Sequence, residues 1–163
     1  MLILLTLLAL SAPPSTQDAT VPTDAAVITS AEGRGVQIYR CTKGQWTFVA
    51  PEATLFDLTT HEKTGSHAAG PSWSWSDGSS ISGKLLQKSP SPEAASIPWL
   101  LLAATPDGAA TGVLSKVTLV RRLETHGGIA PTTGCDAAHE AATARIPYTA
   151  LYIFYRPSAS RPN

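Results

Sequence analysis

Residues 147–157 read PYTALYIFYRP, and this stretch decides the fold class that the sequence predicts. It is dense in aromatic and β-branched residues, which are enriched in strands. Side chains alternate between the two faces of a strand, and apolar residues occupy both faces here. The stretch therefore predicts a central or late strand in the core of a β-sheet.

Shorter segments of the same kind precede this stretch, with turn residues between them. VQIYRC (36–41) and WTFVA (46–50) flank a glycine-containing turn, which predicts a β-hairpin. EATLFDL (52–58) follows Pro51 and predicts a third strand, and ISGKLLQ (81–87) predicts another. IPWLLLAAT (97–105) is a continuous apolar run, typical of a strand that is buried on both faces.

GVLSKVTLVRRLE (112–124) alternates in polarity and predicts a half-buried strand. The apolar face would hold Val113, Val117, Leu119 and Leu123, and the polar face Lys116, Thr118 and Arg122. Residues 136–144 are alanine-rich and predict one short helix or a loop with helical turns.

Together these segments predict an all-β fold: a single-domain β-sandwich or barrel with long loops and at most one short helix. The residues expected to share one core are Trp99, Leu100, Leu101, Leu102, Val117, Leu119, Tyr152 and Phe154.

The length of 163 residues suits one domain, and 12 basic residues balance 12 acidic ones. No basic stripe is present, so nucleic acid is not an expected partner.

The apolar run Leu2–Leu10 is shorter than the roughly 20 residues that span a bilayer, and it has the length of a signal-peptide core. We expect a signal peptide at 1–19 with a loosely defined cleavage site, a lead-in at 20–30, the β-domain at 31–158 and a tail at 159–163. The alternative is a buried N-terminal strand or helix.

Cys41 and Cys135 are the two cysteines of the chain. Metal sites built from cysteine usually need more thiolates or nearby histidines. An even pair in an exported chain predicts one disulfide. The expected location is therefore secreted or extracellular, or periplasmic in a Gram-negative bacterium.

The strongest candidate site is HAAGPSWSWSDGS, residues 67–79, which gathers His67, Trp73, Trp75 and Asp77. In a strand, both tryptophans would share one face. If that face is exposed, the rings form a platform for sugars or other ring-shaped ligands. If it is buried, the rings belong to the core. Asp77 precedes Gly78, a pairing typical of turns, so Asp77 can also serve only to shape the chain.

Catalytic and cofactor motifs are sparse. The fragment Gly33-Arg34-Gly35 lacks the rest of a dinucleotide-binding fingerprint, and neither a P-loop nor a G-x-S-x-G elbow is present. These observations weigh against an enzyme. No cofactor is assigned, and a divalent metal is the alternative. Its candidate ligands are His61, His67, His126, His139, Asp77 and Asp136, without a tight pair such as H-x-H.

The order of the segments resembles a family of exported bacterial and fungal proteins, the domain of unknown function numbered 3455. The resemblance rests on QIYRC, PEATLFD, HAAGPSW, IPWLLL, VTLVRRLETHGG, GCDAAH and PYTALYIFY, between Gly35 and Tyr155. The family pattern resembles H-Y-A-G-P-T-W-E, so Ala68 replaces an aromatic residue and Ser74 an acid. His67, Asp77 and His139 match, as do Cys41, Cys135 and Asp136. The resemblance implies an all-β exported domain and supplies no activity.

We therefore expect a secreted β-protein that binds a small ligand, a glycan or a surface. Its candidate binding residues are His67, Trp73, Trp75, Asp77 and His139. One alternative is a metal-binding protein or an enzyme that uses His67 and Asp77, joined by His139 and Asp136. Another is a structural protein of the cell surface.

Overall fold

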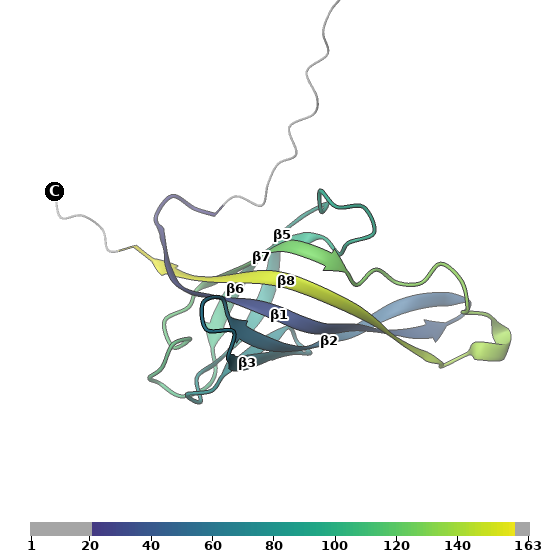
Figure 1. The fold of residues 1–163 in the computed structure, drawn as a ribbon, viewed down its shortest axis with the longest axis horizontal. Coiled ribbons are helices and arrows are strands. Elements are labelled where there is room, and N and C mark those ends of the chain that lie inside the picture. The colour runs from purple at the N-terminus through teal and green to yellow at the C-terminus, as the bar shows by residue number, and fades with distance from the viewer. Residues whose placement is uncertain (1–20, 159–163) are drawn as a thin grey trace, which may run out of the picture.

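The computed structural model describes residues 21–158, which form an eight-stranded antiparallel barrel (Figure 1). Each strand pairs with the next one along the chain, and β8 returns to pair with β1. This confirms the all-β, single-domain prediction and selects the barrel over the sandwich. The strands are β1 (Ala25–Thr42), β2 (Gln45–Asp57), β3 (Lys63–Ala68), β4 (Ser72–Trp75), β5 (Ser80–Ser89), β6 (Trp99–Pro106), β7 (Leu119–Gly127) and β8 (Thr143–Pro157), with one 3-10 turn, η1 (Ala137–His139).

The expected signal peptide, 1–19, lies outside the described residues. In the described part of the chain, no helix has the length and apolar character needed to cross a bilayer.

The closing pair β1 and β8 is the longest contact in the barrel. Its register runs from Ala25 opposite Pro157 to Arg40 opposite Thr143. On β8 the inward side chains are Tyr148, Ala150, Tyr152 and Phe154, all at most 3% exposed. PYTALYIFYRP is thus confirmed as a core strand, and it lies between β1 and β7.

Two strand boundaries differ from the expected ones. The sheet begins at Ala25 rather than Ala31, because the start of β1 is held by pairing with the end of β8. EATLFDL is not a separate third strand, because β2 continues through Pro51. β3 pairs with β2 only at residues Ala53 to Phe56, so one edge of β2 is unpaired at Pro51. Proline has no backbone N–H to donate, and such an edge position tolerates this.

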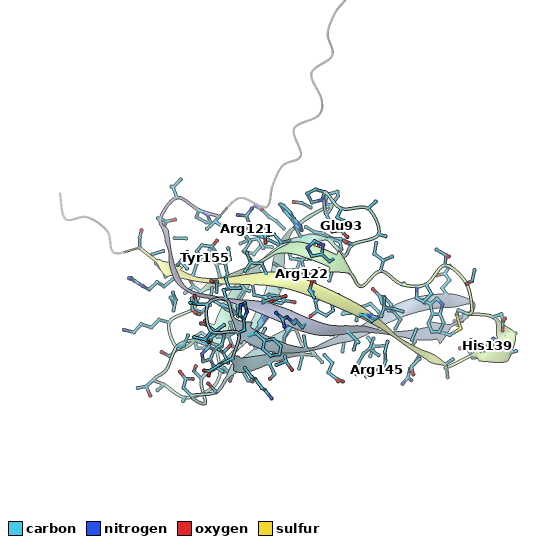
Figure 2. The ribbon with its side chains drawn as sticks, viewed as in Figure 1. Glu93, Arg121, Arg122, His139, Arg145 and Tyr155 are labelled. Atoms are coloured by element: carbon cyan, nitrogen blue, oxygen red, sulfur yellow. A yellow bond between two sulfur atoms is a disulfide. The ribbon has the colours of Figure 1, made fainter. Side chains whose placement is uncertain are left out.

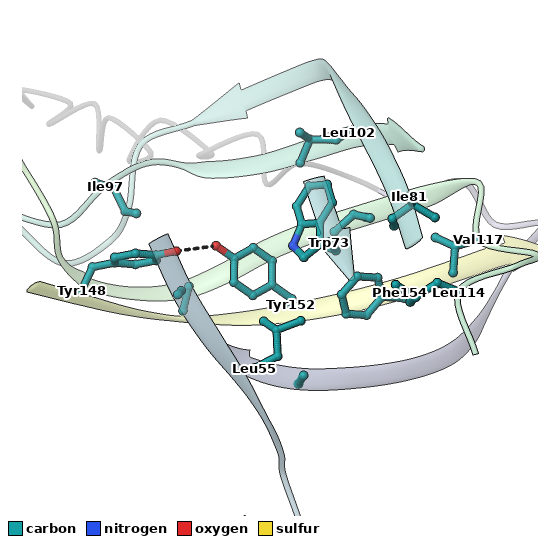
Figure 3. Packing of buried hydrophobic residues seen from close by; sticks show 14 residues of the cluster. Leu55, Trp73, Ile81, Ile97, Leu102, Leu114, Val117, Tyr148, Tyr152 and Phe154 are labelled. Carbon is teal, nitrogen blue, oxygen red and sulfur yellow. Dashed lines mark hydrogen bonds between the residues drawn. The ribbon is translucent and has the colours of Figure 1, made fainter. Parts of the chain in front are cut away.

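The expected strand at 112–124 was wrong in its first half. Residues 112–118 form turns, and β7 begins only at Leu119. Leu114 and Val117 from these turns are fully buried beside Ile81 and Phe154, so the segment packs against one end of the core (Figure 3). The predicted polar face was also wrong, because Arg122 is buried within the barrel.

The core fills the barrel around the aromatic side chains of β4 and β8 (Figure 3). Leu102, Val117, Tyr152 and Phe154 belong to it as expected, and Leu100 packs against it. Leu101 is buried outside this cluster, because neighbouring side chains on a strand point to opposite faces. Trp99 and Leu119 are half-buried.

Gly33 and Gly35 are explained by packing within this barrel. A Cβ at Gly33 would lie 2.5 Å from the Tyr152 ring, and a Cβ at Gly35 would lie 2.0 Å from the Glu52 carbonyl oxygen. Both distances are far below van der Waals contact, so only glycine allows this approach of β2 and β8 to β1.

A disulfide between Cys41 and Cys135 confirms the predicted bond, with 5.3 Å between the Cα atoms. It ties the end of β1 to the segment before η1. Trp46 Nε1 donates to the Thr133 carbonyl oxygen at 2.9 Å and holds the same segment against β2. Figure 2 shows His139 at this end of the molecule, far from Tyr155 at the other.

Candidate binding cavity

The barrel contains a cavity of about 380 Å³ that reaches the surface between β2, the β3–β4 turn and β5. Its inner wall consists of side chains that are at most 9% exposed: Gln37, His67, Trp73, Leu102, Arg122 and Tyr152. Its mouth is formed by apolar side chains that are about half exposed: Phe48, Val49 and Leu85. Pro51, Gly70, Pro71 and Leu100 complete the lining.

His67 and Trp73 meet in this wall because β3 and β4 form a short hairpin that places them opposite each other. Their rings stack with centroids 4.6 Å apart and an angle of 8° between the planes. His67 Nδ1 lies 2.8 Å from the Ser72 carbonyl oxygen. Because a carbonyl can only accept, Nδ1 carries the hydrogen, and Nε2 of the neutral ring is an acceptor.

Burial lowers the pKa of His67 to about 4, and the nearby Arg122 charge adds to the effect. Desolvation penalises the charged form of a side chain, so a buried imidazole resists protonation. His67 is therefore neutral at pH 7 and contributes no charge to the cavity.

Arg122 is the cation of the inner wall. Its Nε and Nη2 donate to the Pro98 carbonyl oxygen at 3.1 Å and 2.7 Å. Burial raises the pKa of both Tyr148 and Tyr152, and the Arg122 charge opposes that rise. Within residues 21–158 no carboxylate forms an ion pair with Arg122, and no acidic side chain lines the cavity.

Two further donors of the inner wall are unused. Gln37 Nε2 and Trp73 Nε1 are buried and make no hydrogen bond to any residue that the structure describes. By contrast, the hydroxyls of Tyr148 and Tyr152 lie 3.1 Å apart and bond to each other (Figure 3). The inner wall thus offers two unpaired N–H donors beside the Arg122 guanidinium, and one ring acceptor, His67 Nε2.

The remaining candidate residues lie outside the cavity. Trp75 shares the inward face of β4 and packs edge-on against Phe154, with centroids 5.7 Å apart. Trp73 is only 1% exposed, so the two rings do not form an exposed platform.

Asp77 shapes a turn. Its carboxylate accepts from Ser79 N at 2.9 Å, from Ser79 Oγ at 2.6 Å and from Val113 N at 2.7 Å. These bonds lower the pKa of Asp77, and the bond from the Ser79 hydroxyl has the largest effect. The aspartate therefore anchors the 112–118 turns to the β4–β5 connection, a separate network from that of His67.

His139 lies beside the disulfide, with its Nδ1 2.7 Å from Asp136 Oδ1. This pair closes the exposed η1 turn, where Asp136 also caps Ala138 N at 2.9 Å. Across the described range 21–158, no three His, Cys, Asp or Glu side chains lie close enough to share a metal ion. The structure therefore does not bring His67 together with Asp77, Asp136 and His139.

Sequence reasoning missed Gln37, Arg122 and Tyr152 as cavity residues. One signal indicated that an arginine would point inward, without saying which of the two: Arg121 and Arg122 are adjacent in a strand, so they must point to opposite faces. In a closed barrel, one of those two faces is the interior.

The fold and the cavity define a class: an up-and-down antiparallel β-barrel with an internal cavity open to solvent. The chain belongs to the family described as protein of unknown function (DUF3455), whose model matches residues 22–156. No curated protein and no solved structure matches the chain.

The burial of His67 predicts a pH-dependent stability. Histidine titrates near 6.5 in the unfolded chain and at about 4 in the fold. Between these values the unfolded state binds more protons, so stability falls as the pH falls, by about 3 kcal/mol in total. Above pH 6.5 the ring is neutral in both states, and below pH 4 it is charged in both.

Urea unfolding at pH 7.5 and pH 4.5 measures this loss. His67→Gln should flatten the pH dependence, whereas His61→Gln, at an exposed position, should keep it. Equal pH profiles for His67→Gln and the unmodified protein would contradict the assignment.

Proposed function

We propose that this protein binds a small, largely apolar ligand inside the barrel. The observation that carries the proposal is the cavity itself, of about 380 Å³, within the core of a closed sheet. An eight-stranded barrel is just wide enough to fill its interior with side chains or to hold one small ligand. Here the side chains leave a space of the size used by small-molecule sites.

The chemistry of the lining favours an apolar ligand over a carbohydrate. The mouth consists of Phe48, Val49 and Leu85, which are exposed to solvent without apolar cover. Sugars carry many hydroxyls that both donate and accept, and a site for them needs matching groups of both kinds. The aromatic side chain best placed to stack on a sugar, Trp73, has its ring face occupied by His67.

We also infer that the protein acts outside the reducing cytoplasm. The Cys41–Cys135 disulfide supports this, because such bonds persist in oxidising compartments. The apolar run Leu2–Leu10, expected to form a signal peptide, points the same way.

Titration with the neutral fluorescent probe N-phenyl-1-naphthylamine tests the binding proposal. We expect saturable binding with one site per chain. Leu85→Ser should weaken it about 3- to 10-fold, because the change removes apolar contact area at the mouth. Leu86→Ser is the matched control: Leu86 is 53% exposed against 51% for Leu85, but it does not line the cavity. No saturable binding, or an equal loss in both variants, would overturn the proposal.

A further inference from the structure

We propose that the ligand is an amphiphilic monoanion, a hydrocarbon with one carboxylate, bound with its acidic group inside the barrel against Arg122. This proposal rests on the proposed function and adds the chemical class and the orientation of the ligand.

The first observation is the guanidinium in the inner wall. Arg122 is 9% exposed, and two of its N–H donors are used on the Pro98 carbonyl oxygen. Arginine has five such donors, and the guanidinium also contacts the Tyr152 hydroxyl, which still leaves N–H donors for a ligand. A buried cation without an anionic partner is costly, and among residues 21–158 no acidic side chain lines this cavity. An anion from outside would supply the missing partner.

The second observation is independent of that charge. Gln37 Nε2 and Trp73 Nε1 line the same wall, are buried, and make no hydrogen bond within residues 21–158. Both atoms can only donate. Such groups are rare in native interiors, and each one calls for a partner that the chain itself does not provide. Carboxylate oxygens accept several hydrogen bonds at once and suit a wall that offers donors.

The number of charges selects a monoanion. Of the described residues that line the cavity, only Arg122 carries a charge, and His67 beside it is neutral at pH 7. A single cation balances one carboxylate, whereas a phosphate monoester carries close to two negative charges at neutral pH. The carboxylate is therefore the better match.

The position of the charge sets the orientation. Gln37, Trp73 and Arg122 belong to the buried wall, while Phe48, Val49 and Leu85 at the mouth are each at least 50% exposed. An amphiphile that enters with its acid first places its hydrocarbon part against this apolar mouth. The reverse orientation would leave the guanidinium unpaired and the carboxylate in contact with apolar side chains.

Isothermal titration calorimetry on the whole delipidated protein tests the proposal with three ligands of equal chain length. Decanoate, decanol and decyltrimethylammonium share a ten-carbon chain, and their head groups are anionic, neutral and cationic at pH 7.5. We expect decanoate to bind at least tenfold more tightly than decanol, and the cation to bind more weakly than either. If decanol binds as tightly as decanoate, the anion proposal fails while the proposed function stands. If none of the three binds and the neutral naphthylamine probe also fails, both proposals fail together.

Variants identify the group responsible. Arg122→Met should abolish the preference for decanoate over decanol. Arg121→Met is the matched control, because Arg121 is adjacent in β7 and does not line the cavity, so its preference should be unchanged. Gln37→Leu removes one donor of the inner wall and leaves the Arg122 charge in place. It should reduce the preference for decanoate over decanol, and it replaces Arg122→Met if that variant does not fold. If folded Arg122→Met still prefers decanoate over decanol as strongly as the unmodified protein, the assignment is overturned. The same result for Gln37→Leu overturns it if Arg122→Met does not fold.

Discussion

Replacing Cys41 and Cys135 together by alanine is expected to lower the free energy of unfolding by about 4 kcal/mol. The bond joins residues that are 94 apart in the sequence, so it closes most of the barrel into one loop. On the chain-entropy account, a cross-link over a loop of this length restricts the unfolded ensemble by roughly 4–5 kcal/mol. The effect is large because a barrel depends on long-range pairing between β1 and β8, which the bond holds together at one end.

Urea denaturation of the protein with and without dithiothreitol provides the measurement. The reduced protein and the double variant should unfold at the same, lower urea concentration, and the double variant should not respond to reductant. A midpoint that is unaffected by reduction would show that the bond contributes little to stability.

Trp73→Ala is the second change with a large expected effect, a loss of about 3–5 kcal/mol. The side chain is 1% exposed and lies at the centre of the core. Its ring contacts His67, Tyr152 and Phe154, with centroids 4.6, 5.9 and 6.3 Å away. Removing the indole would leave a void that these aromatic neighbours cannot fill without shifting β8.

Trp46→Ala is the matched control for this change. Trp46 lies at the start of β2 near the disulfide, where its Nε1 donates one hydrogen bond to the Thr133 carbonyl oxygen. Its loss should cost about 1 kcal/mol, the contribution of a typical hydrogen bond. Both variants can be compared by thermal and urea unfolding monitored by circular dichroism at 218 nm. Similar losses in the two proteins would show that Trp73 is not central to packing.

The local pattern of the sequence was sufficient for the strands with the clearest signals. PYTALYIFYRP is a core strand, VQIYRC and WTFVA pair across a tight turn, and ISGKLLQ lies within β5. Strand formation here depends on β-branched and aromatic residues with turn residues between them, and both are visible in a short window. The disulfide could also be predicted, because two cysteines allow only one pairing.

The tertiary structure alone decided which face of each strand points inward. Alternation assigns side chains to two faces but does not say which face the barrel encloses; closure of β8 onto β1 determines that. For this reason Arg122, which its polarity placed on the outer face of the expected strand, lies in the cavity. For the same reason Trp73 is buried in the core and does not form an exposed binding platform. The role of Asp77 depended likewise on a distant partner, Val113. Such contacts join residues far apart in the sequence, and their geometry arises only when the whole sheet closes.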